Sequence, residues 1–193
     1  MSHHAGVRVW GNRHLVASGL AWALCAVTAV LVFADLVLGL QTLGRPVPAP
    51  FEFRWFEALF ALTALGFSLV GALIVGRQLD NRLGWLACAT GLLTSAYVFA
   101  QSYAAYALYA HPGALLGGEW MAWFRTWSWY PAVSLMLVLV PLLFPDGRLP
   151  SHRWRPVVWV IVAMSGLYCL VTAVTVDPIG VSLPHGLPRP PPK

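Results

Sequence analysis

Residues 15–40 read LVASGLAWALCAVTAVLVFADLVLGL, and this run decides the fold class of the chain. Its one charged residue is Asp35, near the end. A helix of about 26 residues, rising about 1.5 Å per residue, is about 39 Å long, which exceeds the roughly 30 Å hydrocarbon core of a bilayer. We therefore expect a transmembrane helix that is retained as an anchor and is not cleaved as a signal peptide.

The composition of the whole chain indicates the same class. Of its 193 residues 59% are apolar and only 10% are charged, a balance that water-soluble domains rarely show. The basic residues lie at the ends of apolar runs and do not gather on one face, so we expect no nucleic-acid partner. Each of the three cysteines stands alone in a different apolar run, which indicates buried apolar side chains and no disulfide framework.

Four further apolar runs follow the first and are separated by turn-forming residues. The five predicted spans cover about 15–40, 55–75, 83–110, 120–144 and 154–176. The sequence therefore predicts an all-α polytopic membrane helix bundle over residues 15–176. Residues 1–14 form a predicted cytoplasmic segment, and residues 177–193 form a predicted Pro-rich external tail.

The placement of basic residues predicts the orientation of the bundle, because basic loops tend to remain in the cytoplasm. One side carries seven arginines, namely Arg8, Arg13, Arg77, Arg82, Arg148, Arg153 and Arg155. The other side carries Arg45, Arg54 and Arg125, with Arg189 and Lys193 in the tail. We expect the amino terminus inside and, after five spans, the carboxyl terminus outside.

Small residues at a spacing of four occur in the first two spans, where they let helix backbones approach closely. One row consists of Ala21, Cys25 and Ala29, and the other consists of Ala64, Ser68 and Ala72. Such rows either pack within one chain or form the seam of a homodimer. We expect packing within the chain, and the oligomeric state stays open.

No motif for catalysis stands out in the sequence. We find no phosphate-binding glycine loop, no metal-ligand spacing and no nucleophile elbow, so we predict no enzyme activity, no metal and no cofactor. Transport is also disfavoured, because no carboxylate falls near the centre of a predicted span. We expect Asp35 to meet Arg54 or Arg125, or to reach the headgroups, and the helix dipole suffices to explain Glu57 at the start of the second span.

Aromatic residues crowd the outer halves of the third and fourth spans. They form either an ordinary interfacial belt or an outward-facing groove for a hydrophobic or amphiphilic ligand. The predicted groove residues are Gln101, Tyr106, Tyr109, Arg125 and Trp127. Pro131 would kink the fourth span, free a backbone carbonyl and act as a hinge.

A basic hairpin is predicted on the cytoplasmic side between the last two spans. Residues 142–156 read LLFPDGRLPSHRWRP, in which a Pro-Asp-Gly turn precedes several arginines. Its key residues are Pro145, Asp146, Gly147, Arg148, Arg153, Trp154 and Arg155. The arginines would face anionic headgroups, and Trp154 would anchor at the interface.

This hairpin resembles one found in the amino-terminal membrane region of sensor histidine kinases from high-GC Gram-positive bacteria. A second resemblance lies at the turn between the second and third spans, in Gly71–Ile74, Arg77, Asn81 and Gly84–Leu86, although Asp80 departs from the pattern there. The similarity covers about Leu59 to Pro178. The phosphoacceptor and ATP-binding motifs of those kinases do not occur in this sequence.

The resemblance implies two-component signal transduction from the bacterial cytoplasmic (plasma) membrane. We therefore expect a sensory and anchoring module that relays an envelope or membrane signal and has no catalytic part of its own. Its expected partners are the lipid bilayer, a second copy or another membrane protein, and an amphiphilic ligand. The alternative is a small accessory subunit that stabilises a transporter or an envelope assembly complex.

Overall fold

The computed structural model describes residues 3–48, 51–52, 55–79, 81–139, 142 and 151–175. The long helices within these ranges are α1 (His3–Thr42), α2 (Trp55–Arg77), α3 (Arg82–Ala105), α4 (Gly118–Ser134) and α6 (Arg155–Thr175). Two of them continue as single π-helical turns, α3 into η2 (Tyr106–Ala110) and α4 into η3 (Leu135–Leu139). A short 3₁₀ turn, η4 (His152–Trp154), precedes α6. The described residues contain no strand, and the predicted all-α class is confirmed.

Four helical stretches among the described residues are long and apolar enough to cross a membrane. They cover His14–Thr42, Phe56–Arg77, Arg82–Ala110 and Arg155–Thr175. These stretches match four of the five predicted spans and support a membrane protein. The fourth predicted span is not among them. Its described part contains Arg125 and several tryptophans, and the apolar residues at its end lie largely outside the described residues. Part of that predicted span lies outside the described residues. So do four residues of the predicted hairpin, namely Pro145, Asp146, Gly147 and Arg148.

The first helix is longer than the span predicted within it. Its membrane-compatible part is His14–Thr42, close to the predicted span 15–40, and the helix itself already begins at His3. Proline is absent from residues 3–42, so no residue in this stretch removes a backbone donor and ends the helix early. The last helix begins close to its predicted start, and Trp154 and Arg155 lie exposed at its beginning with Arg153.

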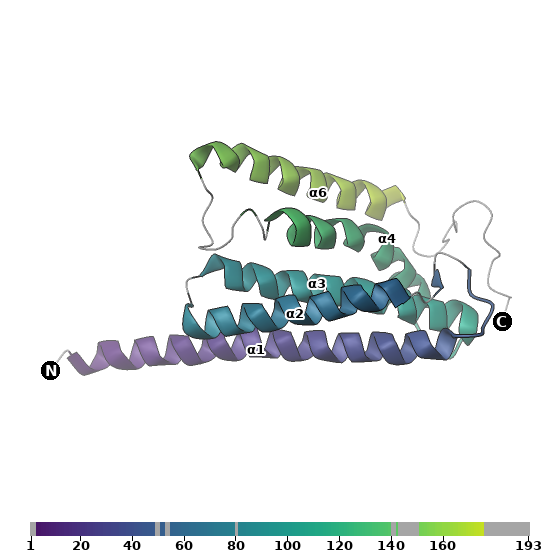
Figure 1. Cartoon of the computed structure of the whole chain (residues 1–193), viewed down its shortest axis with the longest axis horizontal. Coiled ribbons are helices and arrows are strands. Elements are labelled where there is room, and N and C mark those ends of the chain that lie inside the picture. Colours follow the sequence, from purple (N-terminus) through teal and green to yellow (C-terminus); the bar gives the residue numbers. More distant parts are fainter. Residues whose placement is uncertain are drawn as a thin grey trace.

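The helices form a core of three and a lateral pair (Figure 1). In the three-helix core, each of α1, α2 and α3 packs against the other two. The lateral pair consists of α4 and α6. Helix α4 packs against α3, and among the described long helices α6 packs substantially against α4 alone. We use "the Phe51 end" for the end of the bundle where α1 ends, α2 begins and α3 leads into α4.

Glycines bring α2 and α3 into close contact. A Cβ on Gly91 would lie 2.6 Å from the Ala64 carbonyl oxygen, and a Cβ on Gly71 would lie 2.6 Å from the Cys88 amide nitrogen. Ala64, Ser68 and Ala72 are fully buried at this interface. The predicted packing of this small-residue row within the chain is therefore confirmed.

The small-residue row of α1 was predicted less well. Ala21 is fully buried and Cys25 is half-buried against the α2–α3 contact, but Ala29 is exposed. The buried face passes instead through Thr28 and Asp35, because seven residues make almost two full turns of a helix. The three cysteines are free thiols, as predicted.

Side-chain caps hold the turn between α2 and α3. The Asn81 Oδ1 accepts a hydrogen bond from the Leu83 amide at 3.0 Å, which satisfies a free donor at the start of α3. The Trp85 Nε1 donates to the Leu79 carbonyl at 3.1 Å. A Cβ on Gly84 would lie 2.9 Å from side-chain carbons of Ile74 and Val75. Thus Asn81, Gly84 and Trp85, three of the residues that carried the resemblance at this turn, each have a structural role.

Candidate functional site

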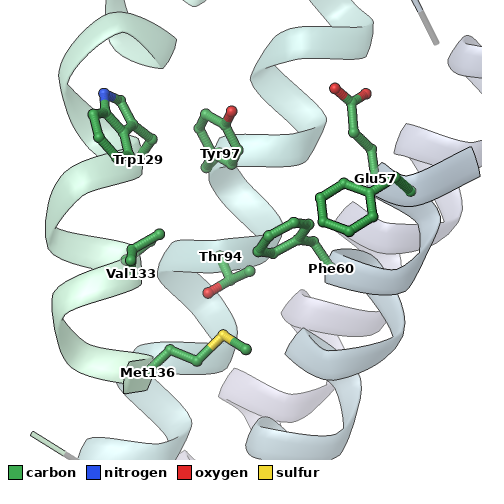
Figure 2. Close-up of a pocket in the computed structure, with 9 residues that line it drawn as sticks. Glu57, Phe60, Thr94, Tyr97, Trp129, Val133 and Met136 are labelled. Carbon is green, nitrogen blue, oxygen red and sulfur yellow. The ribbon is translucent and has the colours of Figure 1, made fainter. Parts of the chain in front are cut away.

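A pocket of about 300 Å³ lies between α2, α3 and α4 (Figure 2). This volume is at the lower end of the range for small-molecule sites. Its lining residues are Phe56, Glu57, Phe60, Thr94, Tyr97, Trp129, Ala132, Val133 and Met136. The carboxylate of Glu57 is the one charged group in this lining, which is otherwise mostly aromatic and aliphatic.

The helix directions give the pocket two different ends. Helices α2 and α4 run away from the Phe51 end, whereas α3 runs toward it. Glu57, Tyr97 and Trp129 consequently lie nearer the Phe51 end, and Val133 and Met136 lie deeper in the bundle (Figure 2). The end of the pocket nearer Phe51, which we call its outer end, holds the carboxylate and aromatic rings, and the inner end is aliphatic apart from the Thr94 hydroxyl. A pocket with this lining suits an amphiphile.

A hydrogen-bonded network connects three helices beside this outer end. The Arg125 Nε of α4 donates to the Gln101 Oε1 of α3 at 2.9 Å. The Gln101 Nε2 donates in turn to the Glu57 carboxylate of α2. Gln101 is buried, so the network stands in a low-dielectric setting where its hydrogen bonds are strong and costly to break.

Asp35 forms a second buried contact next to this network. Its Oδ1 accepts a hydrogen bond from the Ser102 Oγ at 2.7 Å, and the Asp35 side chain is buried. The sequence predicted that Asp35 meets Arg54 or Arg125 or reaches the headgroups. The structure shows the carboxylate covered where α1 packs against α3, with Ser102 as its hydrogen-bond donor, and Arg54 lies outside the described residues. The helix dipole is likewise only part of the account of Glu57, which also accepts a hydrogen bond and lines the pocket.

Three of the five predicted groove residues gather around one ring. The Arg125 guanidinium carbon lies 5.1 Å from the centroid of the Phe51 ring, and the Tyr109 ring lies 5.5 Å from the same ring. Gln101 joins them through its hydrogen bond with Arg125. The structure thus places Gln101, Arg125 and Tyr109 at the Phe51 end, beside the pocket and outside its lining.

The other two predicted groove residues lie elsewhere. The Tyr106 ring packs against His111, with centroids 4.8 Å apart. Trp127 packs against Trp123 and Phe124, at centroid distances of 5.6 and 4.9 Å. Trp129 and not Trp127 is the α4 tryptophan that lines the pocket, because two residues along a helix turn a side chain by about 200°.

Pro131 shapes the contact between α4 and α6. Because proline has no amide hydrogen, the carbonyl of Trp127 four residues earlier loses its helical donor. The Cys169 thiol of α6 lies 3.8 Å from that carbonyl oxygen and donates to it. This geometry agrees with the freed carbonyl that the sequence predicted at Pro131.

Two tryptophan donors strengthen the same helix pair. The Trp129 Nε1 donates to the Tyr168 hydroxyl at 2.8 Å, and the Trp123 Nε1 donates to the Ala173 carbonyl at 3.1 Å. Together with the Cys169 contact, these bonds connect α6 to α4 at three levels. We therefore treat α4 and α6 as one unit.

The pocket spans the joint between this unit and the core. One wall belongs to α2 and α3, and the other wall, formed by Trp129, Ala132, Val133 and Met136, belongs to α4 and η3. The second wall flanks Pro131 and runs into a π-helical turn, a feature often found at functional sites. Any occupant of the pocket would contact both sides of the joint.

A buried polar atom in the pocket lacks a partner. The Thr94 side chain is 3% exposed, and its hydroxyl forms no hydrogen bond within the described part of the chain. Figure 2 shows this hydroxyl directed toward the space beside Val133 and Met136. Buried polar groups nearly always have a partner, so this hydroxyl is available to an occupant of the pocket.

Sequence reasoning missed the pocket lining, although a signal for it exists. Trp129, Ala132, Val133 and Met136 follow the helical spacing i, i+3, i+4, i+7 around Pro131. Their opposing partners come from two other helices, whose depth and rotation the sequence does not give. Among the described residues, no group of three or more histidine, cysteine or acidic side chains is placed to hold a metal ion.

Comparisons of the chain with protein-family models, with curated proteins and with solved structures find no match. The resemblance to sensor kinase membrane regions therefore stays an expectation from the sequence.

Proposed function

We propose that this chain is a sensory and anchoring module of the bacterial plasma membrane, and that the pocket between α2, α3 and α4 receives an amphiphilic signal. One observation carries the proposal, namely that the pocket spans the joint between the three-helix core and the α4–α6 unit. The unpartnered Thr94 hydroxyl and the polar outer end support a ligand that has both an apolar and a polar part.

The relay follows from differential binding. A ligand shifts a conformational equilibrium only if it contacts the two states differently. An occupant of this pocket touches the core on one side and the Pro131 segment on the other, so filling the pocket favours one position of α4. Because α6 is bonded to α4, it follows that movement.

The proposed topology places the Phe51 end outside, with α4 as a fifth span and the amino terminus inside. The basic residues at the opposite end support this orientation, with Arg77 and Arg82 beside the α2–α3 turn and Arg153 before α6. A signal from outside would then reach the cytoplasmic side through α6. We assign no reaction to the chain itself, in line with the resemblance.

A second candidate function rests on the surface of α6. This helix has no buried residue, and Trp159, Leu170 and Val174 are among its exposed apolar side chains. Such a face would suit an accessory subunit of a transporter or an envelope assembly complex. Stable co-purification of such a complex in mild detergent would favour this alternative. It would be favoured further if removal of the complex left the occupant of the pocket unchanged.

The experiment that tests the proposal asks what occupies the pocket. A photo-crosslinking phenylalanine analogue replaces Val133, which lines the pocket, or Leu137, which is 63% exposed on the same helical stretch. After irradiation in native membranes, mass spectrometry should find a distinct small amphiphile attached at Val133, with bulk phospholipid at Leu137. The same phospholipid adducts at both positions would contradict a selective pocket.

A further inference from the structure

Four aromatic rings line the same pocket as a single carboxylate. The rings belong to Phe56, Phe60, Tyr97 and Trp129, and the carboxylate belongs to Glu57. An aromatic ring is electron-rich on its faces and attracts a cation, and groups of aromatic rings recognise quaternary ammonium ions in proteins. The carboxylate adds a negative charge among these rings.

We propose that the pocket binds a lipophilic organic ammonium ion, a proposal that rests on the pocket being the signal site. The cationic group would lie at the outer end beside Glu57, Tyr97 and Trp129, and the apolar body would extend toward Val133 and Met136. The pocket volume of about 300 Å³ limits the size of the occupant. At about 30 Å³ per non-hydrogen atom, which is the volume of one water molecule in the liquid, the pocket holds about ten such atoms.

The same lining disfavours an anion and a simple neutral chain. An anionic group at the outer end would meet the Glu57 carboxylate and the electron-rich ring faces. Arg125 does not line the pocket, although it belongs to the network of Glu57 through Gln101, so the one charge in the lining itself is the Glu57 carboxylate. A neutral chain would gain apolar contact but nothing from the carboxylate.

Three probes of nearly equal size test the charge preference. Phenyltrimethylammonium is cationic, tert-butylbenzene is its neutral isostere and benzenesulfonate is anionic. Equilibrium dialysis of each labelled probe against the full chain in lipid nanodiscs, with empty nanodiscs as the blank, measures saturable binding. We expect saturable binding of the cation and none of the anion, with the neutral probe at least about tenfold weaker than the cation.

Variants then locate the site. Glu57→Gln keeps the shape of the side chain and should weaken cation binding at least about tenfold. Trp129→Leu should weaken it by about two- to thirtyfold, which corresponds to one lost cation–π contact. The matched controls Glu119→Gln and Trp120→Leu make the same chemical changes at exposed residues of α4 that lie outside the pocket lining, and they should leave cation binding unchanged.

Two results would overturn the proposal. One is equal binding of the neutral and cationic probes with no effect of Glu57→Gln, which would show a purely apolar pocket. The other is that the folded wild-type chain shows no saturable cation binding that Glu57→Gln weakens. The cooperative unfolding of that chain shows that it was folded. Either result leaves the sensory proposal to the crosslinking experiment at Val133, which identifies an occupant of any charge.

Discussion

Replacing Gly91 by alanine tests the packing that holds the three-helix core together. The added Cβ would lie 2.6 Å from the Ala64 carbonyl oxygen and 2.8 Å from the Ser68 amide nitrogen. The first distance is about 0.8 Å shorter than the 3.4 Å at which ordinary contact begins. Because both atoms belong to the backbone of α2, no side-chain rotation relieves the clash, and the two helices must separate.

The size of the effect follows from this separation. Inserting a methyl group into a packed interface costs about 1–3 kcal/mol. The higher helix propensity of alanine returns at most about 1 kcal/mol. The matched control is Gly66→Ala in α2, where a Cβ meets nothing within 4 Å, so that only the favourable term remains. We expect the Gly91 variant to be less stable than the Gly66 variant by about 1–3 kcal/mol.

Reversible unfolding measures this difference. Purified protein in mixed micelles is titrated with sodium dodecyl sulfate, and helix content is followed by circular dichroism. The Gly91 variant should unfold at a lower detergent fraction than the wild type, and the Gly66 variant should unfold at an equal or higher one. Equal stability of the two variants would refute the close approach of α2 and α3 at Gly91.

Three further substitutions test other contacts. Trp85→Phe removes the bond to the Leu79 carbonyl and should cost about 1 kcal/mol in the same titration, and no loss would contradict the bond. Gln101→Leu removes a buried acceptor of Arg125 and the amide that donates to Glu57, and it should cost about 2–4 kcal/mol in the same titration, whereas no loss would contradict these two bonds. Pro131→Ala restores an amide donor and should slow hydrogen exchange in the second half of α4, and unchanged exchange would argue against the hinge.

Much of the helix content was predictable because it depends on local properties of the sequence. Residues 15–40 and 154–176 are apolar over the length that a bilayer requires, and the structure places α1 and α6 there. The predicted span starts close to the membrane-compatible part of α1 at His14, whereas the helix begins at His3, since hydropathy marks the membrane and not the end of a helix. A helix that leaves the bilayer keeps its hydrogen bonds as long as no residue interrupts them.

The candidate site was predictable only in part, because it depends on how helices rotate against one another. Gln101 and Arg125 were predicted as polar members of an outward-facing groove among aromatic residues, and the structure joins them by a hydrogen bond. Trp127 was selected over Trp129, although the two residues face different neighbours. Glu57 was set aside because a helix dipole explained it, and its partner Gln101 is 44 residues away in the sequence.

The central claim is that the state of the pocket determines the position of the α4–α6 unit on the core. Spin labels at exposed positions report on it, with one pair across the joint at Leu69 and Leu170 and one pair within the core at Leu20 and Leu69. The native cysteines are replaced first. Electron–electron double resonance in nanodiscs then gives both distances.

Thr94→Phe fills the pocket in place of a ligand, and Thr63→Phe adds the same side chain at an exposed site of α2. The account predicts that Thr94→Phe shifts the distance across the joint by about 1–2 Å, the scale of helix movements in switching proteins, and leaves the distance within the core unchanged. Thr63→Phe should change neither distance. If Thr94→Phe leaves the distance across the joint unchanged, or shifts both distances equally, the pocket does not control the α4–α6 unit.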